Sequence, residues 1–245
     1  YTWNPPPFHP VEGYSNFLWV ILLEMVWRVL GIEPPVSANW MSLATSLGTL
    51  AVVAFMGLKM RLVGACASRR HLFVGLALLG VVSNRIFLTW TSSGLEASLF
   101  NLLFSAWVLC LCLPPRDPDR QVAYTVLIAT LAHLTRPDGL LLVLATLALL
   151  VVSLLQGTIK PRHLWYALPI LVVPAHFLWR HWYYGTWLPN TYYAKYVAPW
   201  PEAGIRYFAS FLLEHSFWIW IVLALTWLVT RLARLRSLAE LRVPV

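Results

Sequence analysis

Long apolar runs separated by short polar interruptions make up most of the chain. Seven runs predict membrane-crossing helices, because a spanning helix needs about 20 largely apolar residues. The fourth is short and ends in charged residues, so we expect its end to lie against protein rather than lipid. The seven runs cover residues 39–60, 72–90, 96–113, 122–135, 139–156, 164–181 and 206–230.

An eighth apolar stretch, Ser15 to Gly31, is shorter and carries Glu24 and Arg28 four positions apart on one helical face. This pattern predicts a helix lying in the membrane interface. The expected fold class is therefore all-α, a polytopic membrane helical bundle of about seven transmembrane helices with an interfacial N-terminal helix. We expect one domain over 1–245, with a loop and interfacial helix at 1–38, the bundle at 39–230 and a basic tail at 231–245.

The composition agrees with a membrane protein. Hydrophobic residues make up 59% of the 245 residues and charged residues 11%, whereas about a quarter of a typical soluble domain is charged. The net charge of +8 does not indicate nucleic-acid binding, because no basic stripe or recognition module accompanies it. The three cysteines contain no C-x-x-C pair, so neither a disulfide framework nor a metal site is predicted.

The positions of Lys and Arg predict which way each loop faces, since short loops rich in these residues stay in the cytoplasm. Twelve of the 18 fall in one set of loops and the C-terminal tail. We therefore expect a multi-pass protein of the cell (inner or plasma) membrane, with its active site on the extracytoplasmic side. That side holds seven of the ten acidic residues: Glu12, Glu24, Glu33, Glu96, Asp138, Glu202 and Glu214.

Two of these carboxylates are candidate catalytic groups. Glu12 lies in the Pro-rich segment YTWNPPPFHPVEGY, and Glu96 follows Thr-Ser-Ser-Gly-Leu. Each could equally be a carboxylate that stabilises the positive end of a helix dipole. Arg85 lies inside an apolar run, where an unpaired guanidinium costs about 2.5–3.5 kcal/mol, so we expect it to have a partner and take it as a candidate substrate-binding residue.

The fourth and fifth runs meet at the segment HLTRPDG, residues 133–139. Its Arg136 and Asp138 could simply clamp a helical hairpin. A planar guanidinium at the mouth of a cavity is also a favoured ligand for phosphate or carboxylate, and charges at the ends of packed spans usually mark a site. We therefore take Arg136 and the neighbouring His133 as candidate substrate ligands, and Asp138 as a candidate catalytic carboxylate.

The longest outer loop, residues 182–205, reads WYYGTWLPNTYYAKYVAPWPEAGI. An interfacial aromatic belt explains its rings but not the Pro-Asn-Thr turn followed by a lysine. Aromatic faces with amide and hydroxyl groups suit a sugar, and a cation suits a phosphate. The candidate substrate-binding residues here are Tyr184, Asn190, Thr191, Tyr193 and Lys195.

Four of these pieces, TWNPPPFHPVEGYSNFLW, SSGLEASLF, TRPDG and YYGTWLPNTYYAK, resemble membrane glycosyltransferases of the GT-C fold. The chain most closely resembles the branch of terminal arabinofuranosyltransferases of mycobacterial cell walls. The resemblance implies inverting transfer of a sugar from a polyprenyl-phosphate carrier to a glycan or other acceptor outside the cytoplasm. It implies that Glu12 belongs to the first outer loop, Glu96 and Asp138 to the cavity rim, and Asn190, Thr191 and Lys195 to the donor-binding loop. Arg136 and Lys195 would bind the carrier phosphate.

The chain departs from the family pattern in one respect, since a pair of Asp at the end of a first span has no counterpart. We therefore expect a fragment that lacks this span and the main base; otherwise Glu12, Glu96 or Asp138 must supply it. No cofactor is specified, although a divalent metal could assist. A transporter or flippase, which also needs buried charges, and a non-catalytic membrane assembly subunit stay open as alternatives.

Overall fold

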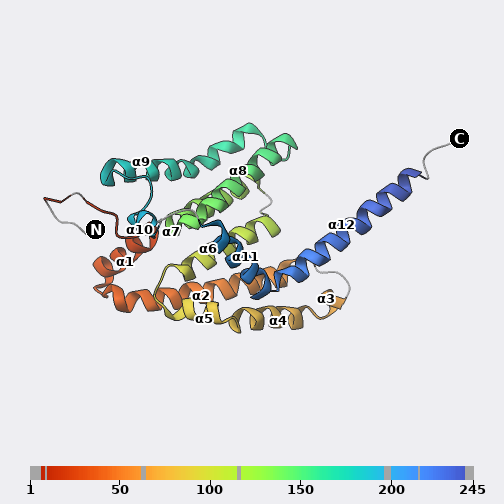
Figure 1. Ribbon diagram of the computed structural model, residues 1–245, viewed down its shortest axis with the longest axis horizontal. Coiled ribbons are helices and arrows are strands. Elements are labelled where there is room, and N and C mark those ends of the chain that lie inside the picture. Colours follow the sequence, from red (N-terminus) through yellow and green to blue (C-terminus); the bar gives the residue numbers. More distant parts are fainter. Residues whose placement is uncertain are drawn as a thin grey trace. The chain divides into compact units, whose positions relative to one another are not determined.

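The computed structural model describes residues 7–8, 10–61, 65–114, 117–195, 200–214 and 216–240 (Figure 1). The chain forms two compact units, residues 1–193 and 194–245. All regular elements of the described residues are helical, which confirms the expected all-α class. The order is α1 Phe17–Leu30, α2 Pro34–Lys59, α3 Ala65–Ser68, α4 Arg70–Val82, α5 Arg85–Ser92, α6 Ala97–Cys112, α7 Pro118–Thr135, η1 Pro137–Gly139, α8 Leu140–Leu155, η2 Pro161–Leu171, α9 Val172–Tyr184, α10 Asn190–Lys195, α11 Pro201–Glu214 and α12 Phe217–Glu240.

Fewer helices could cross a membrane than the seven expected. In the described part of the chain, α2 and the segment Pro137–Leu155 are long and apolar enough, and up to four spans result if two bent helix pairs each count as one. The other runs form helices that are too short or too polar. Helix α6 has 16 residues, a length of about 24 Å against a hydrocarbon core of about 30 Å. The run 164–181 is divided between the 3-10 helix η2, with Pro169 inside it, and the 13-residue α9.

The second run is divided as well, because α4 and α5 meet at a bend of 66°. Asn84 lies at the bend, where its side-chain oxygen accepts hydrogen bonds from the backbone N–H groups of Ile86 (2.9 Å) and Phe87 (3.1 Å). An asparagine in this position starts a new helix, since it satisfies N–H groups that have no partner within the helix. Arg85 is therefore the first residue of a helix rather than an interior residue of a span.

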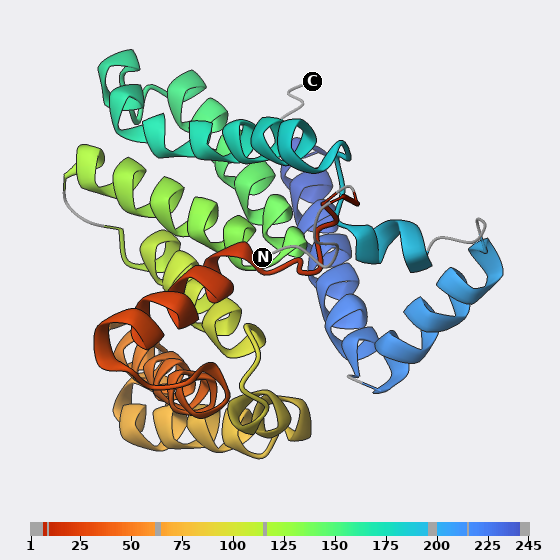
Figure 2. The same cartoon turned by 90° about the vertical axis from the view of Figure 1, so that its left-hand side faces the viewer.

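Helix α7 is at the centre of the first unit. It packs against α6, α8, η2 and α9, as Figure 2 shows from the side. Most of its buried residues are small or β-branched, and Val126, Ala129 and Ala132 are fully buried. Small residues let neighbouring helices approach closely, which is how helices pack where lipid removes the hydrophobic driving force.

Helix α2 has its polar face inside and its apolar face outside. Ser42, Ser46 and Thr49 are buried, whereas Trp40 and Leu47 are more than half exposed. Hydroxyl groups also join the helices, as between Thr91 and Ser46 (2.9 Å) and between Trp107 and Thr146 (2.9 Å). An apolar outer face is unfavourable in water but stable in lipid, so this arrangement is typical of a helix that contacts a membrane.

The second unit contains α11 and α12, and its two helices pack through the rings of Phe211 and Phe217, whose centroids lie 5.2 Å apart. An exposed ion pair joins Arg206 to Glu202 on α11 (2.6 Å). None of the expected site residues except Lys195 falls in this unit.

We expect Gly139→Ala to lower the stability of the protein. A Cβ at residue 139 would lie 2.3 Å from the carbonyl carbon of Ala132 and 2.4 Å from the backbone nitrogen of His133, so the hairpin between α7 and α8 would have to open. Overpacking of this kind costs about 1–3 kcal/mol. Equilibrium unfolding in detergent micelles measures the loss, with Gly75→Ala as the control, since a Cβ there meets no atom within 4 Å. Equal stability of the two variants would contradict the prediction.

Candidate functional site

The turn before α6 fixes the position of Glu96. Gly94 adopts a φ of +69°, a left-handed conformation that favours glycine. Its carbonyl accepts a hydrogen bond from the indole N–H of Trp19 on α1 (3.2 Å). The carbonyl of Leu95 accepts from the hydroxyl of Ser42 on α2 (3.3 Å) and from that of Ser98 (3.2 Å). Helices α1 and α2 therefore hold the loop that carries the glutamate at the start of α6.

The end of α7 fixes the position of Arg136. The residue is extended (φ −149°), and its backbone N–H still donates to the carbonyl of Ala132 (3.0 Å). Pro137 follows and disfavours a helical conformation at the preceding residue, so α7 ends here. Helix α8 then begins one short 3-10 turn later, after Asp138 and Gly139.

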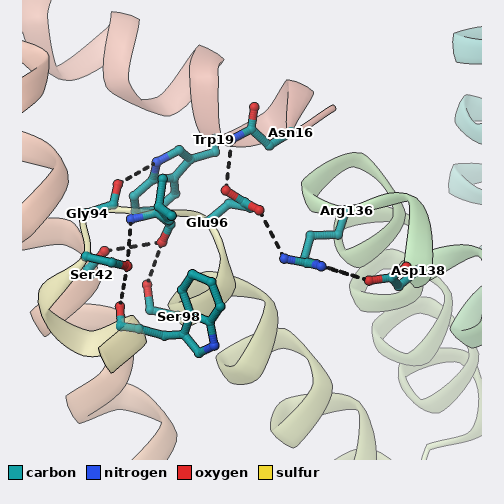
Figure 3. A network of polar contacts seen from close by, with 11 residues as sticks. Asn16, Trp19, Ser42, Gly94, Glu96, Ser98, Arg136 and Asp138 are labelled. Atoms are coloured by element: carbon teal, nitrogen blue, oxygen red, sulfur yellow. Dashed lines mark hydrogen bonds and ion pairs between the residues drawn. The ribbon is translucent and has the colours of Figure 1, made fainter. Parts of the chain in front are cut away.

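The first candidate site is a polar network of four side chains at these helix ends (Figure 3). One oxygen of Glu96 accepts from Asn16 (2.9 Å), which precedes α1, and the other from the Nη1 of Arg136 (3.1 Å). The Nε and Nη2 groups of the same guanidinium donate to Asp138 at 3.2 and 3.0 Å. We call Asn16, Glu96, Arg136 and Asp138 the Arg136 network. The Arg–Asp clamp considered from the sequence exists, and a second carboxylate binds the same guanidinium.

Helix dipoles stabilise the charges of this network. Glu96 lies at the N-terminus of α6 and Arg136 at the C-terminus of α7. A negative charge at an N-terminus and a positive charge at a C-terminus each gain about 0.3–1 kcal/mol. The ion pair across the two neighbouring termini is thus favourable without any ligand. A structural role for Glu96 is accordingly present whether or not it also takes part in chemistry.

Glu12 lies in a second network, in which its partner is Arg180 on α9. The Nε and Nη2 groups of Arg180 donate to one carboxylate oxygen of Glu12 at 3.0 and 2.6 Å. Both side chains are at least 94% buried. Burial raises the pKa of Glu12 and the guanidinium opposes that rise. Removing one partner of such a pair leaves an uncompensated buried charge.

Two tyrosine hydroxyls meet beside this pair, since Tyr14 and Tyr184 lie 3.3 Å apart. Burial is the main cause that raises the pKa of Tyr14, and the hydrogen bond with Tyr184 adds to it. Burial also raises the pKa of Tyr184. Both phenols therefore stay protonated at neutral pH, and because one O–H donates to the other phenol, one O–H of the pair can still donate a hydrogen bond to a ligand.

An open groove runs between α1 and α9 next to these tyrosines. Its volume is about 380 Å³, and the Glu24–Arg28 ion pair lies along it. The interfacial stretch expected from the sequence is thus a helix, and its apolar side forms one wall of the groove. The aromatic residues of the walls are Tyr14, Phe17, Trp179, Tyr183 and Tyr184.

His133 lies in α7, one turn before Arg136, but outside the Arg136 network. It is buried, and its ring is near that of His176 on α9, with centroids 6.1 Å apart. Neither ring nitrogen of either histidine has a hydrogen-bond partner among the described residues. The two imidazoles form a third polar group in the first unit.

Among the described residues, no hydrogen bond or ion pair joins Arg85, Asn190, Thr191 or Tyr193 to the Arg136 network. Arg85 is exposed at the start of α5, and the described residues offer it no ion-pair partner, contrary to our expectation. Asn190, Thr191 and Tyr193 are exposed on the short helix α10. Lys195 ends this helix, and its side chain lies outside the described residues.

The sequence analysis missed three residues that now stand out, Arg180, His176 and Asn16. A signal existed for Arg180, because it lies in an apolar run as Arg85 does, and the same cost of an unpaired guanidinium implied a partner. No comparable signal marks Asn16, which is an ordinary helix-start residue by sequence. The described residues contain no group of three His, Cys, Asp or Glu side chains that could hold a metal ion.

We expect Arg180→Met to lower the stability of the protein by about 3–5 kcal/mol, because Glu12 would keep a buried charge without a partner. The double variant with Glu12→Leu should recover much of this loss, since no unpaired charge then remains. Equilibrium unfolding in detergent micelles measures both. The control is Glu202→Gln, which removes an exposed ion pair worth at most about 1 kcal/mol. A loss for Arg180→Met as small as for the control would show that the pair is not buried.

Comparison with known proteins assigns no family to this geometry. No protein-family model, no curated protein and no solved structure matches the chain.

Proposed function

We propose that the chain belongs to a membrane glycosyltransferase that moves a sugar from a polyprenyl phosphate to a glycan or other acceptor. The sugar is arabinofuranose if the motif resemblance holds. The observation that carries the proposal is the Arg136 network, in which two motifs 40 residues apart supply a guanidinium and a carboxylate to one cluster. Charged groups among apolar helices need partners and are by default candidates for a functional site.

Arg136 is the group that we propose for the carrier phosphate. A guanidinium has five N–H donors, and its hydrogen bonds to Glu96 and Asp138 use three of them. One third of its side chain is exposed, so two donors remain for a ligand. Two parallel N–H bonds match the oxygens of a phosphate, and they would stabilise the charge that develops on the leaving phosphate during transfer.

The net charge of the Arg136 network means that a bound phosphate needs a further positive charge nearby. Two carboxylates around one guanidinium leave one net negative charge, which repels a phosphate. A further cation must offset it, and Lys195 is our candidate, as the resemblance implies. A divalent metal bound together with the donor phosphate would serve the same purpose, since Mg²⁺ is commonly held by one or two carboxylates plus substrate phosphates.

Of the three candidate catalytic carboxylates, Asp138 is the one that an acceptor can reach. Its side chain is 62% exposed, whereas that of Glu96 is 15% and that of Glu12 is 3% exposed. A general base must come within hydrogen-bond distance of the proton it removes. We therefore assign Asp138 to the acceptor hydroxyl and Glu12 and Glu96 to positioning.

The groove between α1 and α9 suits the acceptor or the carrier. Its tyrosine and tryptophan rings offer flat apolar faces, and its hydroxyls and the Glu24–Arg28 pair offer hydrogen bonds. Such a combination is common in sites for sugars and amphiphilic ligands. By the Lys and Arg distribution, this end of the helices faces away from the cytoplasm, in the cell membrane.

A transporter is the second candidate, and the bend of 66° between α4 and α5 favours it. Discontinuous helices form the substrate sites of many transporters. The two functions differ in their product, because a transporter moves a lipid-linked sugar unchanged whereas a transferase consumes it.

We expect Arg136→Ala to lower kcat/KM for the donor at least about tenfold, the effect of losing a charged hydrogen bond of about 1.5–3 kcal/mol. The assay uses the full-length gene product in sealed liposomes, a labelled pentofuranosyl polyprenyl phosphate and an oligosaccharide acceptor. Arg120→Ala is the control, because this exposed arginine lies at the opposite end of α7 beside Asp117. Unchanged transfer by Arg136→Ala would remove the phosphate assignment, and movement of intact donor without transfer would favour the transporter.

A further inference from the structure

His133 and His176 are the only described residues with buried side-chain nitrogen or oxygen atoms that lack a hydrogen-bond partner. His133 is 5% exposed, and all four ring nitrogens of the pair are shielded from solvent. The proposed transfer reaction uses neither His176 nor any contact between the two rings. This pair therefore needs an explanation of its own.

Buried polar groups in proteins are nearly always satisfied by protein, water or ligand. A neutral imidazole carries one N–H donor and one nitrogen acceptor, so the pair offers two donors and two acceptors. A hydroxyl group can donate one hydrogen bond and accept two. One hydroxyl can therefore bind an acceptor on one ring and a donor on the other.

The separation of the rings fits one shared oxygen. The centroids lie 6.1 Å apart and the planes meet at 80°. If a nitrogen of each ring faces the same oxygen, that oxygen lies about 4 Å from both centroids, and the separation of 6.1 Å then corresponds to an angle of about 100° at the oxygen. This angle is close to the tetrahedral arrangement of a hydroxyl oxygen. A single metal ion, with bonds of about 2.0–2.1 Å to each nitrogen, would need a much wider angle.

The neighbouring charge also disfavours a cation. Arg180 is one helical turn after His176, and its guanidinium lies 5.9 Å from the ring of Phe177. That ring in turn packs 5.3 Å from His133. The Arg180 guanidinium is itself bound to Glu12, so it offers little attraction to a free anion. A neutral hydroxyl suits such a place better than either kind of ion.

We propose that His133 and His176 together bind one hydroxyl oxygen between α7 and α9. Two rings separate the pair from the groove, because Phe17 and Trp179 line the groove and pack on His176 at centroid distances of 4.8 and 5.8 Å. The hydroxyl is either an internal water or a hydroxyl of a sugar that reaches past these rings from the groove. Only the second source rests on the proposed function.

Nitrogen NMR of the histidine side chains tests the proposal. The full chain is labelled with [¹⁵N]histidine in nanodiscs, and the signals of the pair are assigned with the variants His133→Leu and His176→Leu. We expect a hydrogen-bonded nitrogen in each ring, and we expect its shift to change when the other histidine is replaced. A signal present without additive indicates water, and one that appears only with a methyl pentofuranoside indicates the sugar hydroxyl. Free-imidazole shifts under both conditions would overturn the proposal, as would stoichiometric binding of Zn²⁺ at the pair.

Stability provides a second readout. A shared oxygen couples the two residues. Each single variant should raise the unfolding equilibrium constant by some factor, and the double variant should raise it by less than the product of these two factors. We expect a coupling of at least about threefold in the unfolding equilibrium constant, within the range known for residues of one network. Phe177→Leu measures the loss of a ring with no polar atoms from the same cluster. If each His→Leu variant instead stabilises the protein independently, the nitrogens bind nothing and the proposal fails. Sugar transfer by the Arg136 variants is unaffected by this result, so the two proposals can fail separately.

Discussion

Charged groups among apolar helices need partners, and the ion pair between Glu96 and Arg136 meets that need where α6 begins and α7 ends. The pair joins two helix termini whose dipoles already favour these charges. It also fixes the loop that Trp19 and Ser42 hold from the other side. Asn16 and Asp138 extend the contact to the start of α1 and the start of α8. The geometry of the candidate site follows from this single link between otherwise apolar elements.

The second pair, Glu12 with Arg180, also gives two charged groups a partner each, but in a different environment. It is almost fully buried, whereas the Arg136 network is partly exposed. A buried pair orders the segment before α1 against α9 and so shapes one end of the groove. A partly exposed guanidinium with unused donors can bind a ligand through those donors. Burial thus distinguishes the two ion pairs: the buried pair positions the chain, and the partly exposed pair is the ligand site that we propose.

Much of the fold could be predicted from the apolar runs, because each run became helix and the interfacial stretch became α1. The number of spans could not. The length of a run does not reveal that Asn84 starts a new helix within the run 72–90. Nor does it reveal that the first part of the run 164–181 forms the 3-10 helix η2. The local motifs predicted Glu96, Arg136 and Asp138, since each lies at a helix end marked by Gly or Pro. Their long-range partners were harder to find: Asn16 and His176 are ordinary residues by sequence, and only packing brings them to their partners.

The account depends on Arg136 as the ligand of the carrier phosphate. An experimental structure of the full-length protein in nanodiscs with a polyprenyl phosphate tests this most directly. The account predicts phosphate oxygens within about 2.7–3.0 Å of the two N–H groups of Arg136 that Glu96 and Asp138 leave free. A phosphate bound elsewhere, with the bonds from Arg136 to Glu96 and Asp138 intact, would contradict it.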